Sequence, residues 1–546
     1  MKKLFFNLFI CLTLTSTALF AQQHFPKKPK LVVGIVVDQM RYDYLTRFDK
    51  KYQADGFKRL LTEGFSLENA HYNHIPTYTA VGHASIFTGA SPSIHGIIGN
   101  NWYDKYEKKS IYCVDDDAYK TVGNHGDEGE RSPRRLRTTT FADQLRLSQS
   151  MNGKTIGIAI KDRSAILPAG HTANAAYWFD GDEQGKWISS SYYMDNLPSW
   201  VVDFNNSNKA KSYLNKAWTS LYNINTYTES IEDDNLFEAS FRGEEKPVFP
   251  HNISELAKSN GNYNLLKLIP AGNSFTTDFA KAAIIGENLG GTQHTDFLSI
   301  SYSSTDYVGH QFGVSSKEIE DTYLRLDKDL ANLFSFLDTK VGKNNYTVFL
   351  TADHAATEVP QYLQSVKIPA AYFKPKEFLE YLQELTLRLF GSDELIENIS
   401  NFQIFLDHNK ISNLKINYDK LTQSLVDYAV KYKDIYKAVS AKTLQATYFT
   451  EGILCYLQNG YNQKYSGDVL LIPNPSTVIY PKVGSTHGSG YSYDTHIPII
   501  FYGKGIKKGS SKKKYHIVDI APTLSNLLNI AFPNGNSGKI VEEALK

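Results

Sequence analysis

Continuous apolar runs rich in β-branched residues recur along the chain and indicate buried strands. The first reads LVVGIVV over residues 31–37, and similar runs cover residues 155–160, 296–302, 346–350 and 497–502. Runs without polar alternation are typical of strands that are covered on both faces in a parallel sheet. We therefore expect a central, mostly parallel sheet.

Between several of these runs, apolar residues recur with helical periodicity. Over residues 316–337, one face carries Ile319, Tyr323, Leu326, Leu330 and Leu337. Ser315 and Glu318 have the spacing of a capping box at the start of this helix. The alternation of strands and helices predicts an α/β fold with helices on both faces of the sheet.

Two intervals interrupt this alternation. Residues 170–276 are rich in Asn, Ser, Tyr and Trp and contain a predicted hairpin, AYWFD followed by WISSSYY. Residues 369–470 include an amphipathic helix over 376–390 that ends at Gly391. Neither interval has a linker rich in Gly and Pro. We therefore interpret both as lid-like insertions in one large domain of residues 22–546.

Residues 1–21 have the pattern of a secretory signal peptide. Lys2 and Lys3 precede an apolar run over residues 4–14, and small residues follow at Ser16, Ala18 and Ala21. The apolar run is too short to cross a bilayer. We expect a periplasmic or secreted protein without stable membrane insertion.

The composition is that of a folded globular protein, with 42% hydrophobic and 21% charged residues. Lys and Arg number 58 against 57 Asp and Glu, so the formal net charge is +1. No global charge attracts nucleic acid, and an anionic substrate requires a local site. Cys113 and Cys455 follow the signal segment, and the sequence leaves open whether they pair.

Acids and histidines stand beside four of the predicted strands: Asp38, Asp306, His310, Asp353, His354 and His487. Each of them alone is more often a turn former or an ordinary histidine. Together they gather where the carboxyl ends of parallel strands meet, and carboxylate with imidazole suits zinc. Three acids and three histidines are enough for two zinc ions with positions left open for substrate.

A threonine lies in the stretch NHIPTYTAVGHASIFTG, residues 73–89. The stretch predicts a loop that runs through Pro76 into a helix beginning near Thr79. Exposed N–H groups at such a helix start form an anion site, so the hydroxyl of Thr79 would face a docked anion. A helix-capping role is the alternative for this residue by itself.

The order of these residues resembles the alkaline phosphatase superfamily. HIVDIAPTLSNLL at residues 516–528 resembles a segment of its nucleotide pyrophosphatase and sulfatase-like branches. The combination of a Thr nucleophile with KDR at residues 161–163 and GNNWY from Gly99 is similar to the phosphate-irrepressible alkaline phosphatases of the PafA type. A sulfatase would need Cys or Ser in a C/S-x-P-S-R setting, which this chain lacks.

The resemblance implies an exported alkaline phosphatase that holds two zinc ions and hydrolyses small phosphate monoesters. One ion would be bound by Asp306, His310 and His487, and the other by Asp38, Asp353 and His354. Thr79 would contact both ions and form a phospho-threonine intermediate. The phosphoryl oxygens would be bound by Asn100, Lys161 and Arg163.

Two departures and several alternatives accompany this interpretation. Ala355 stands where many relatives have Gly, and matching ligands for a third metal are absent. A phosphodiesterase or nucleotide pyrophosphatase of the same superfamily, or a non-catalytic phosphate-binding protein, is the alternative function. We interpret the basic group at residues 131–137 and the acids Asp115–Asp117 as surface. The organic group of the substrate and the oligomeric state stay open.

Overall fold

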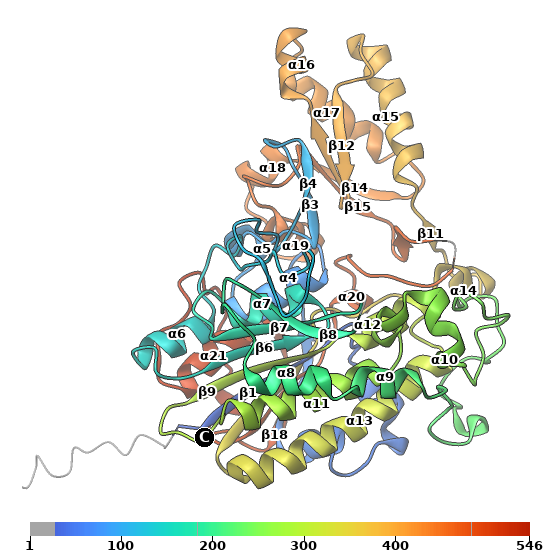
Figure 1. Cartoon of the computed structure of the whole chain (residues 1–546). Helices are drawn as coiled ribbons and strands as arrows, with labels where there is room; N and C mark the ends of the chain where they lie inside the picture. Colours follow the sequence, from blue (N-terminus) through green and yellow to red (C-terminus); the bar gives the residue numbers. More distant parts are fainter. Residues whose placement is uncertain (1–27, 183, 482) are drawn as a thin grey trace, which may run out of the picture.

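The computed structural model describes residues 28–546 except residues 183 and 482 (Figure 1). The predicted signal peptide at residues 1–21 lies outside the described residues. Within the described part, no helix combines the length and apolar character that crossing a membrane requires.

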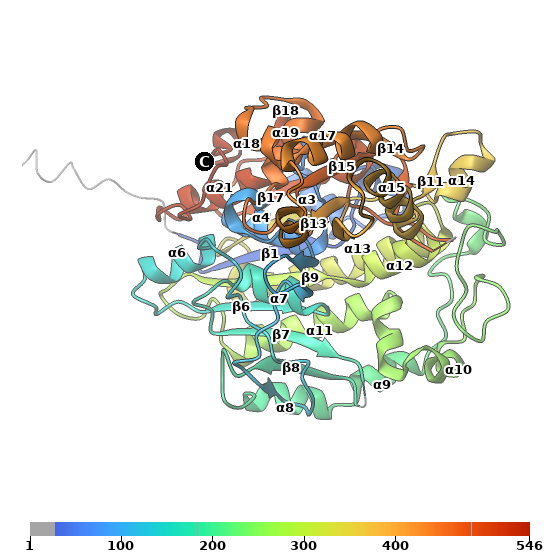
Figure 2. The same ribbon diagram turned by 90° about the horizontal axis from the view of Figure 1, so that it is seen from above.

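A ten-stranded sheet forms the centre of the molecule. Its strands are, in spatial order, β18 (Gly509–His516), β2 (Phe65–His71), β17 (Ile499–Gly503), β10 (Tyr346–Thr351), β1 (Leu31–Val37), β9 (Asp296–Tyr302), β6 (Thr155–Ala159), β7 (Ala175–Asp180), β8 (Lys186–Ser190) and β5 (Thr121–Val122). Figure 2 shows β1, β9, β6, β7 and β8 following one another across the molecule.

The five predicted strands all belong to this sheet. The central strands β10, β1, β9, β6 and β7 run parallel. The strand β17 runs antiparallel to both of its neighbours, β10 and β2. It begins at Ile499 rather than at residue 497, after Pro498, which has no N–H to donate to a ladder. The expected mostly parallel sheet is therefore confirmed at the centre, with antiparallel strands on its flanks.

Helices cover both faces of the sheet, because neighbouring side chains of each strand point in opposite directions. On one face, a Cβ at Gly157 of β6 would lie 2.1 Å from the carbonyl oxygen of Ala165 in α7 (Asp162–Ala169). On the other, Tyr177 of β7 packs edge-on against Phe279 of α11 (Ala271–Gly286), with ring centroids 5.5 Å apart. The absent side chain at Gly157 lets α7 approach the sheet closely.

The long amphipathic helix is α13 (Lys317–Leu337), and its cap differs from the prediction. Ser316, not Ser315, is the N-cap and accepts from the N–H of Ile319 over 3.1 Å. The hydroxyl of Ser315 instead donates to Glu358 over 2.7 Å. The predicted capping box of Ser315 and Glu318 is wrong, because tertiary partners engage the Ser315 side chain.

The two interrupting intervals have different structures. In the first, β7 and β8 form the predicted hairpin, which extends the large sheet. The second contains its own four-stranded sheet of β12 (Ile396–Ser400), β13 (Gln403–Leu406), β15 (Val469–Pro473) and β14 (Ile435–Ser440). The helices α15 (Pro375–Phe390) and α17 (Tyr418–Ala429) pack with it at the top of Figure 1. Gly391 ends α15 with φ 76°, as predicted.

Candidate active site

The predicted acids and histidines come together because their strands are neighbours in the sheet. Asp38 follows β1, Asp353 and His354 follow β10, and Asp306 and His310 lie on α12 (Ser304–Phe312) after β9. Strands β10, β1 and β9 are adjacent and parallel, so their carboxyl ends deliver these side chains to one edge. His487 reaches the same place from the loop between β16 (Thr477–Val478) and α20 (Ser492–Thr495).

Two groups of possible ligand atoms result. In the first, Asp306 Oδ1 lies 3.1 Å from His310 Nε2 and 3.6 Å from His487 Nε2. The second group, whose atoms lie within 4.8 Å of one another, joins Asp38, Asp306 and His354.

Asp353 was expected in the second group, and it too lies close. Its Oδ2 is 3.5 Å from His354 Nε2, and Asp38 Oδ1 is also 3.5 Å from that nitrogen. Asp306 therefore stands between the two groups, and the geometry allows it to contribute to both.

Backbone carbonyls orient the three imidazoles. His310 Nδ1 lies 2.7 Å from the oxygen of Ser485, and His487 Nδ1 lies 2.6 Å from that of Thr77. The Nδ1 of His354 is 3.1 Å from its neighbour's carbonyl. Donation by Nδ1–H leaves each Nε2 lone pair directed at the carboxylates, which is the arrangement of metal-binding histidines.

Burial shifts the pKa values of the acids and of His487 in this cluster. Burial raises the pKa of Asp38 to about 6. Burial, followed by the charge of Asp38, also holds the pKa of Asp353 well above its usual range. Burial lowers the pKa of His487 to about 3, so this imidazole is neutral and able to bind metal. Asp38 Oδ1 and Asp353 Oδ2 are buried and have no hydrogen-bond partner among the residues that the structure describes. This donor set of carboxylate and imidazole fits zinc.

Thr79 is the first residue of α4 (Thr79–Thr88) and is 1% exposed. Its Oγ1 lies 3.4 Å from His354 Nε2, at the edge of the cluster. Tyr78, and not Thr79, occupies the N-cap position, and the side chain oxygen Oδ1 of Asn100 accepts from the N–H of Ala80 over 2.8 Å. The helix-cap alternative for Thr79 is therefore wrong, and Asn100 carries out that role.

Lys161 and Arg163 flank the same edge from the start of α7. The Nζ of Lys161 donates to Asp38 Oδ2 over 2.7 Å and to Asp306 Oδ2 over 2.5 Å. Arg163 Nη1 donates to the hydroxyl of Tyr112 over 3.0 Å, and its buried Nε has no hydrogen-bond partner within the described part of the chain.

Sequence reasoning missed two residues that orient this site. Gln39 donates from Nε2 to Asp306 Oδ1 over 2.8 Å and from its N–H to Asp353 Oδ1 over 3.2 Å. The hydroxyl of Tyr112 accepts from Arg163 Nη1 and donates to Asp162 Oδ1 over 2.5 Å, so it links the two side chains. The position of Gln39 directly after Asp38 is a signal that could have found it.

The basic group and the acidic run are not simple surface. Arg131 Nε pairs with Asp162 Oδ2 over 3.1 Å, and Arg134 pairs with Asp116 over 2.9 Å. Asp116 is only 3% exposed. The surface interpretation is wrong for Asp116 and for the half-buried Arg131, which helps to fix the KDR segment, whereas Arg134, Arg137 and Asp117 are exposed as expected. Cys113 and Cys455 are both free thiols.

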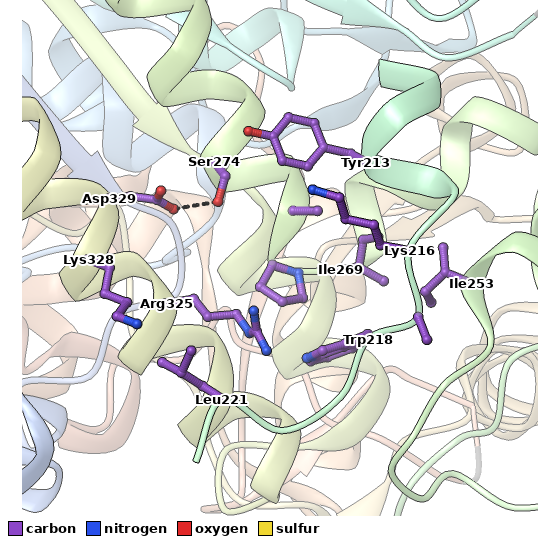
Figure 3. A pocket seen from close by; sticks show the side chains of 13 residues that line it. Tyr213, Lys216, Trp218, Leu221, Ile253, Ile269, Ser274, Arg325, Lys328 and Asp329 are labelled. Atoms are coloured by element: carbon purple, nitrogen blue, oxygen red, sulfur yellow. Dashed lines mark hydrogen bonds between the residues drawn. The ribbon is translucent and has the colours of Figure 1, made fainter. Parts of the chain in front are cut away.

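Two cavities differ in their relation to the cluster. One of about 310 Å³ is bounded by Tyr78, His487, Asn401 and Phe402, so it opens beside the cluster. The other, of about 320 Å³, lies between Trp218, Ile269 and α13 (Figure 3). None of the candidate site residues lines the second cavity.

Residues 32–496 match the family described as type I phosphodiesterase / nucleotide pyrophosphatase. The chain belongs to this family. The chain is 47% identical to alkaline phosphatase PhoV of Synechococcus elongatus, over 95% of this chain and 93% of that protein. It is 45% identical to alkaline phosphatase PafA of Elizabethkingia meningoseptica over 95% of both chains.

A third relative, from Myroides odoratus, is 45% identical over 95% of both chains and carries the name calcium-transporting ATPase. Among solved structures, wild-type alkaline phosphatase PafA superposes with a TM-score of 0.91 and 43% identity, over 95% of this chain and 99% of that chain. The alkaline phosphatase-like α/β fold of this family member is thereby confirmed.

Proposed function

We propose that this chain is an alkaline phosphatase that uses two zinc ions to hydrolyse phosphate monoesters through a phosphorylated Thr79. The observation that carries the proposal is the buried Thr79 hydroxyl, at a helix start and 3.4 Å from His354 in the acid and histidine cluster. The relatives named alkaline phosphatases, PhoV and PafA, support the reaction class.

Each zinc ion would have three protein ligands. Asp306, His310 and His487 would hold one ion, and Asp38, Asp353 and His354 would hold the other. Bound zinc makes a coordinated hydroxyl easier to ionise and stabilises negative charge on oxygen. The carbonyl-held imidazoles and Gln39 keep the ligand atoms oriented before binding, so little reorganisation is needed.

The proposed reaction has two steps, phosphorylation of Thr79 and hydrolysis of the phospho-threonine. The Thr79 hydroxyl gives its proton to solvent, and its oxygen attacks phosphorus and forms a P–O bond while the bond to the ester oxygen breaks. The leaving alkoxide takes up a proton and departs as an alcohol. Water then attacks the phospho-threonine, which releases inorganic phosphate and restores the Thr79 hydroxyl. Thr79 is buried at the start of α4, which limits the positions that its oxygen can take and would favour attack on a docked phosphoryl group.

Three side chains would bind the phosphoryl oxygens. Arg163 offers a fork that Tyr112 already orients, and the amide Nδ2 of Asn100, whose Oδ1 accepts from Ala80, offers a neutral donor. Lys161 supplies a buried positive charge among the acids. This positive set suits the dianion of a monoester better than the single charge of a diester.

Phosphodiester hydrolysis is the second candidate, because the family description includes phosphodiesterases. The deciding experiment compares a matched aryl phosphate monoester, diester and sulfate before and after chelation. We expect the monoester to react fastest and chelation to stop that reaction. Faster diester hydrolysis would favour the second candidate, and no turnover with the zinc-loaded protein would favour a non-catalytic phosphate-binding protein.

We also propose that the protein is exported to the periplasm or the medium, because residues 1–21 have the pattern of a signal peptide. Fractionation of the expressing cells tests this proposal. The insertions at residues 170–276 and 369–470 would act as lids. The position of Asn401 and Phe402 beside His487 supports this role for the second insertion.

A further inference from the structure

The cavity of about 310 Å³ beside the acid and histidine cluster has walls from three separate parts of the chain. Tyr78 comes from the loop before α4, and Phe402 comes from the second insertion. His487 and Tyr493 come from the segment before β17. Pockets that bind small molecules measure about 300–1,000 Å³, so this cavity is large enough to hold part of a substrate.

The direction of displacement at phosphorus decides which part of the substrate would face this cavity. Thr79 Oγ1 lies 3.4 Å from His354 Nε2, which in turn lies 3.5 Å from Asp38 and Asp353. The attacking and leaving oxygens lie roughly in line, on opposite sides of phosphorus. The leaving oxygen would then face the other ligand group, to which His487 belongs. Because His487 lines the cavity, the organic group of the ester would reach it.

Much of the wall is apolar or aromatic: Tyr78, Pro375, Ile399, Phe402, Val478 and Tyr493. Two polar groups of the wall are engaged by other residues. Asn401 Nδ2 donates to the carbonyl of Asn101 over 2.7 Å, and the hydroxyl of Ser489 donates to Asp494 Oδ2 over 2.6 Å. An apolar ring would gain by leaving water for these walls, whereas a sugar would give up hydrogen bonds to water.

Two tyrosines of the wall are held in place. The ring of Tyr78 meets the ring of His487 edge-on, with centroids 5.9 Å apart. A Cβ at Gly488 would lie 2.5 Å from Cε1 of Tyr78, so the missing side chain leaves room for this ring. The hydroxyl of Tyr493 accepts from the N–H of Ser476 over 2.7 Å. Walls that are already ordered lower the entropic cost of binding.

Phe402 has a strained backbone conformation at the tip of a hairpin. Asn401 and Phe402 join β12 to β13 and have φ angles of 51° and 56°. Two-residue turns with positive φ at both positions favour Asn followed by Gly, and a bulky residue there is an outlier. Such strain persists mainly at functional sites. The ring packs against Phe373, with centroids 5.0 Å apart, and also lines the cavity.

We propose that this cavity binds the organic group of the phosphate monoester and prefers an apolar ring, with Phe402 and Tyr78 as the residues that determine the preference. The inference rests on the proposed phosphatase function and names its substrate class. The preferred substrates are monoesters of alcohols that carry an aromatic or other apolar ring, rather than phosphorylated sugars or small alkyl esters.

The test compares benzyl phosphate, glucose 6-phosphate and methyl phosphate as substrates of the zinc-loaded protein. All three are esters of primary alcohols. The first two carry a ring of similar size next to the CH₂ group that bears the phosphate, so they differ mainly in polarity. We expect kcat/KM for benzyl phosphate to exceed each of the other two values by about tenfold, because an apolar ring is buried against aromatic side chains.

Replacement of Phe402 separates a substrate contact from a packing role. Gly adopts positive φ freely, so Phe402→Gly relieves the turn while it removes the ring. This variant should lower kcat/KM for benzyl phosphate by about tenfold and affect glucose 6-phosphate far less. Phe402→Tyr, which keeps a ring, should retain the preference. Tyr448→Ala removes a ring of the same insertion that is 85% exposed and does not line the cavity, so it should change none of the three values.

Equal kcat/KM for benzyl phosphate and glucose 6-phosphate in the wild type would overturn the proposal, whether or not the variants fold. A preference for benzyl phosphate that survives in Phe402→Gly would also overturn it. Turnover of methyl phosphate by the same samples measures the phosphatase reaction without a ring. Failure of the ring subsite is therefore distinguishable from failure of the phosphatase proposal, in which none of the three esters would react.

Discussion

The ammonium group of Lys161 lies 2.7 Å from Asp38 Oδ2, although Asp38 is a candidate zinc ligand. Burial opposes the charge of Lys161, but the carboxylates of Asp306 and then Asp38 raise its pKa above the usual range. Lys161 therefore stays charged inside the cluster. Its contacts with ligand acids separate its role from that of Arg163, which touches no candidate ligand among its described hydrogen bonds.

Replacement of Arg163 tests monoester preference most cleanly. Arg163→Ala should lower monoester kcat/KM by about 100-fold or more, because a buried, oriented donor is lost. Diester hydrolysis should change far less, because a diester carries a substituent on one of the oxygens that Arg163 would face. The measurement is kcat/KM for matched aryl monoester and diester substrates.

Lys161→Ala is the comparison for that experiment. Because Lys161 touches Asp38 and Asp306, its loss should reduce both activities and alter zinc affinity as well. Zinc content is measured beside turnover. If Arg163→Ala lowered both activities by the same factor, the assignment of Arg163 to the phosphoryl oxygens would be wrong.

The active protein should contain two zinc ions per chain, since the cluster offers six ligands and isolated buried carboxylates are costly. Chelation should abolish turnover, and added zinc should restore it. His310→Ala and Asp353→Ala should each lose most activity and part of the zinc. Elemental analysis that finds at most one transition metal in fully active protein would contradict the two-ion site.

Gly82→Ala should damage the site without altering any ligand. A Cβ at Gly82 of α4 would lie 2.1 Å from the carbonyl oxygen of Asp353, a backbone atom that cannot rotate away. We expect a loss of stability of about 1–3 kcal/mol, as for overpacked cores, and weaker zinc binding. Thermal unfolding and zinc titration measure both.

Ala84→Gly in the same helix is the control. This substitution should lower the free energy of unfolding by about 1 kcal/mol through the lower helix propensity of Gly, and it adds no atom near Asp353. Equal zinc affinity in Gly82→Ala and wild type would show that α4 does not set the position of Asp353.

The sequence predicted the strands well because each depends on a local apolar pattern, and the position of acids and histidines beside those strands predicted that they would lie together. The apolar run of β1 is buried along its whole length, and Asp38 follows it directly. The antiparallel direction of β17 was not predictable, because an apolar run does not reveal which way a strand crosses the sheet.

Contacts between distant segments account for the other misses. Tyr112 meets Asp162 across 50 positions, and Ser315 meets Glu358 across 43. Neither pairing leaves a local pattern. In the sequence, Asp116 belongs to a run of acids that is typical of exposed positions. In the folded chain, Arg134 and Ser132 contact its carboxylate.

Thr79→Ala should fold and bind zinc normally but lose turnover by several orders of magnitude, because the nucleophilic oxygen is removed. Thr79→Ser, which keeps a hydroxyl at the start of α4, should retain measurable turnover. Both variants are compared with wild type in the aryl phosphate assay.

The most direct measurement is an acid quench of wild-type enzyme during turnover of an aryl phosphate, followed by peptide mapping. The proposed mechanism predicts phosphate on Thr79 and on no other residue, and none on the Thr79→Ala variant. Phosphate on a different side chain, or full activity of Thr79→Ala, would contradict nucleophilic attack by Thr79.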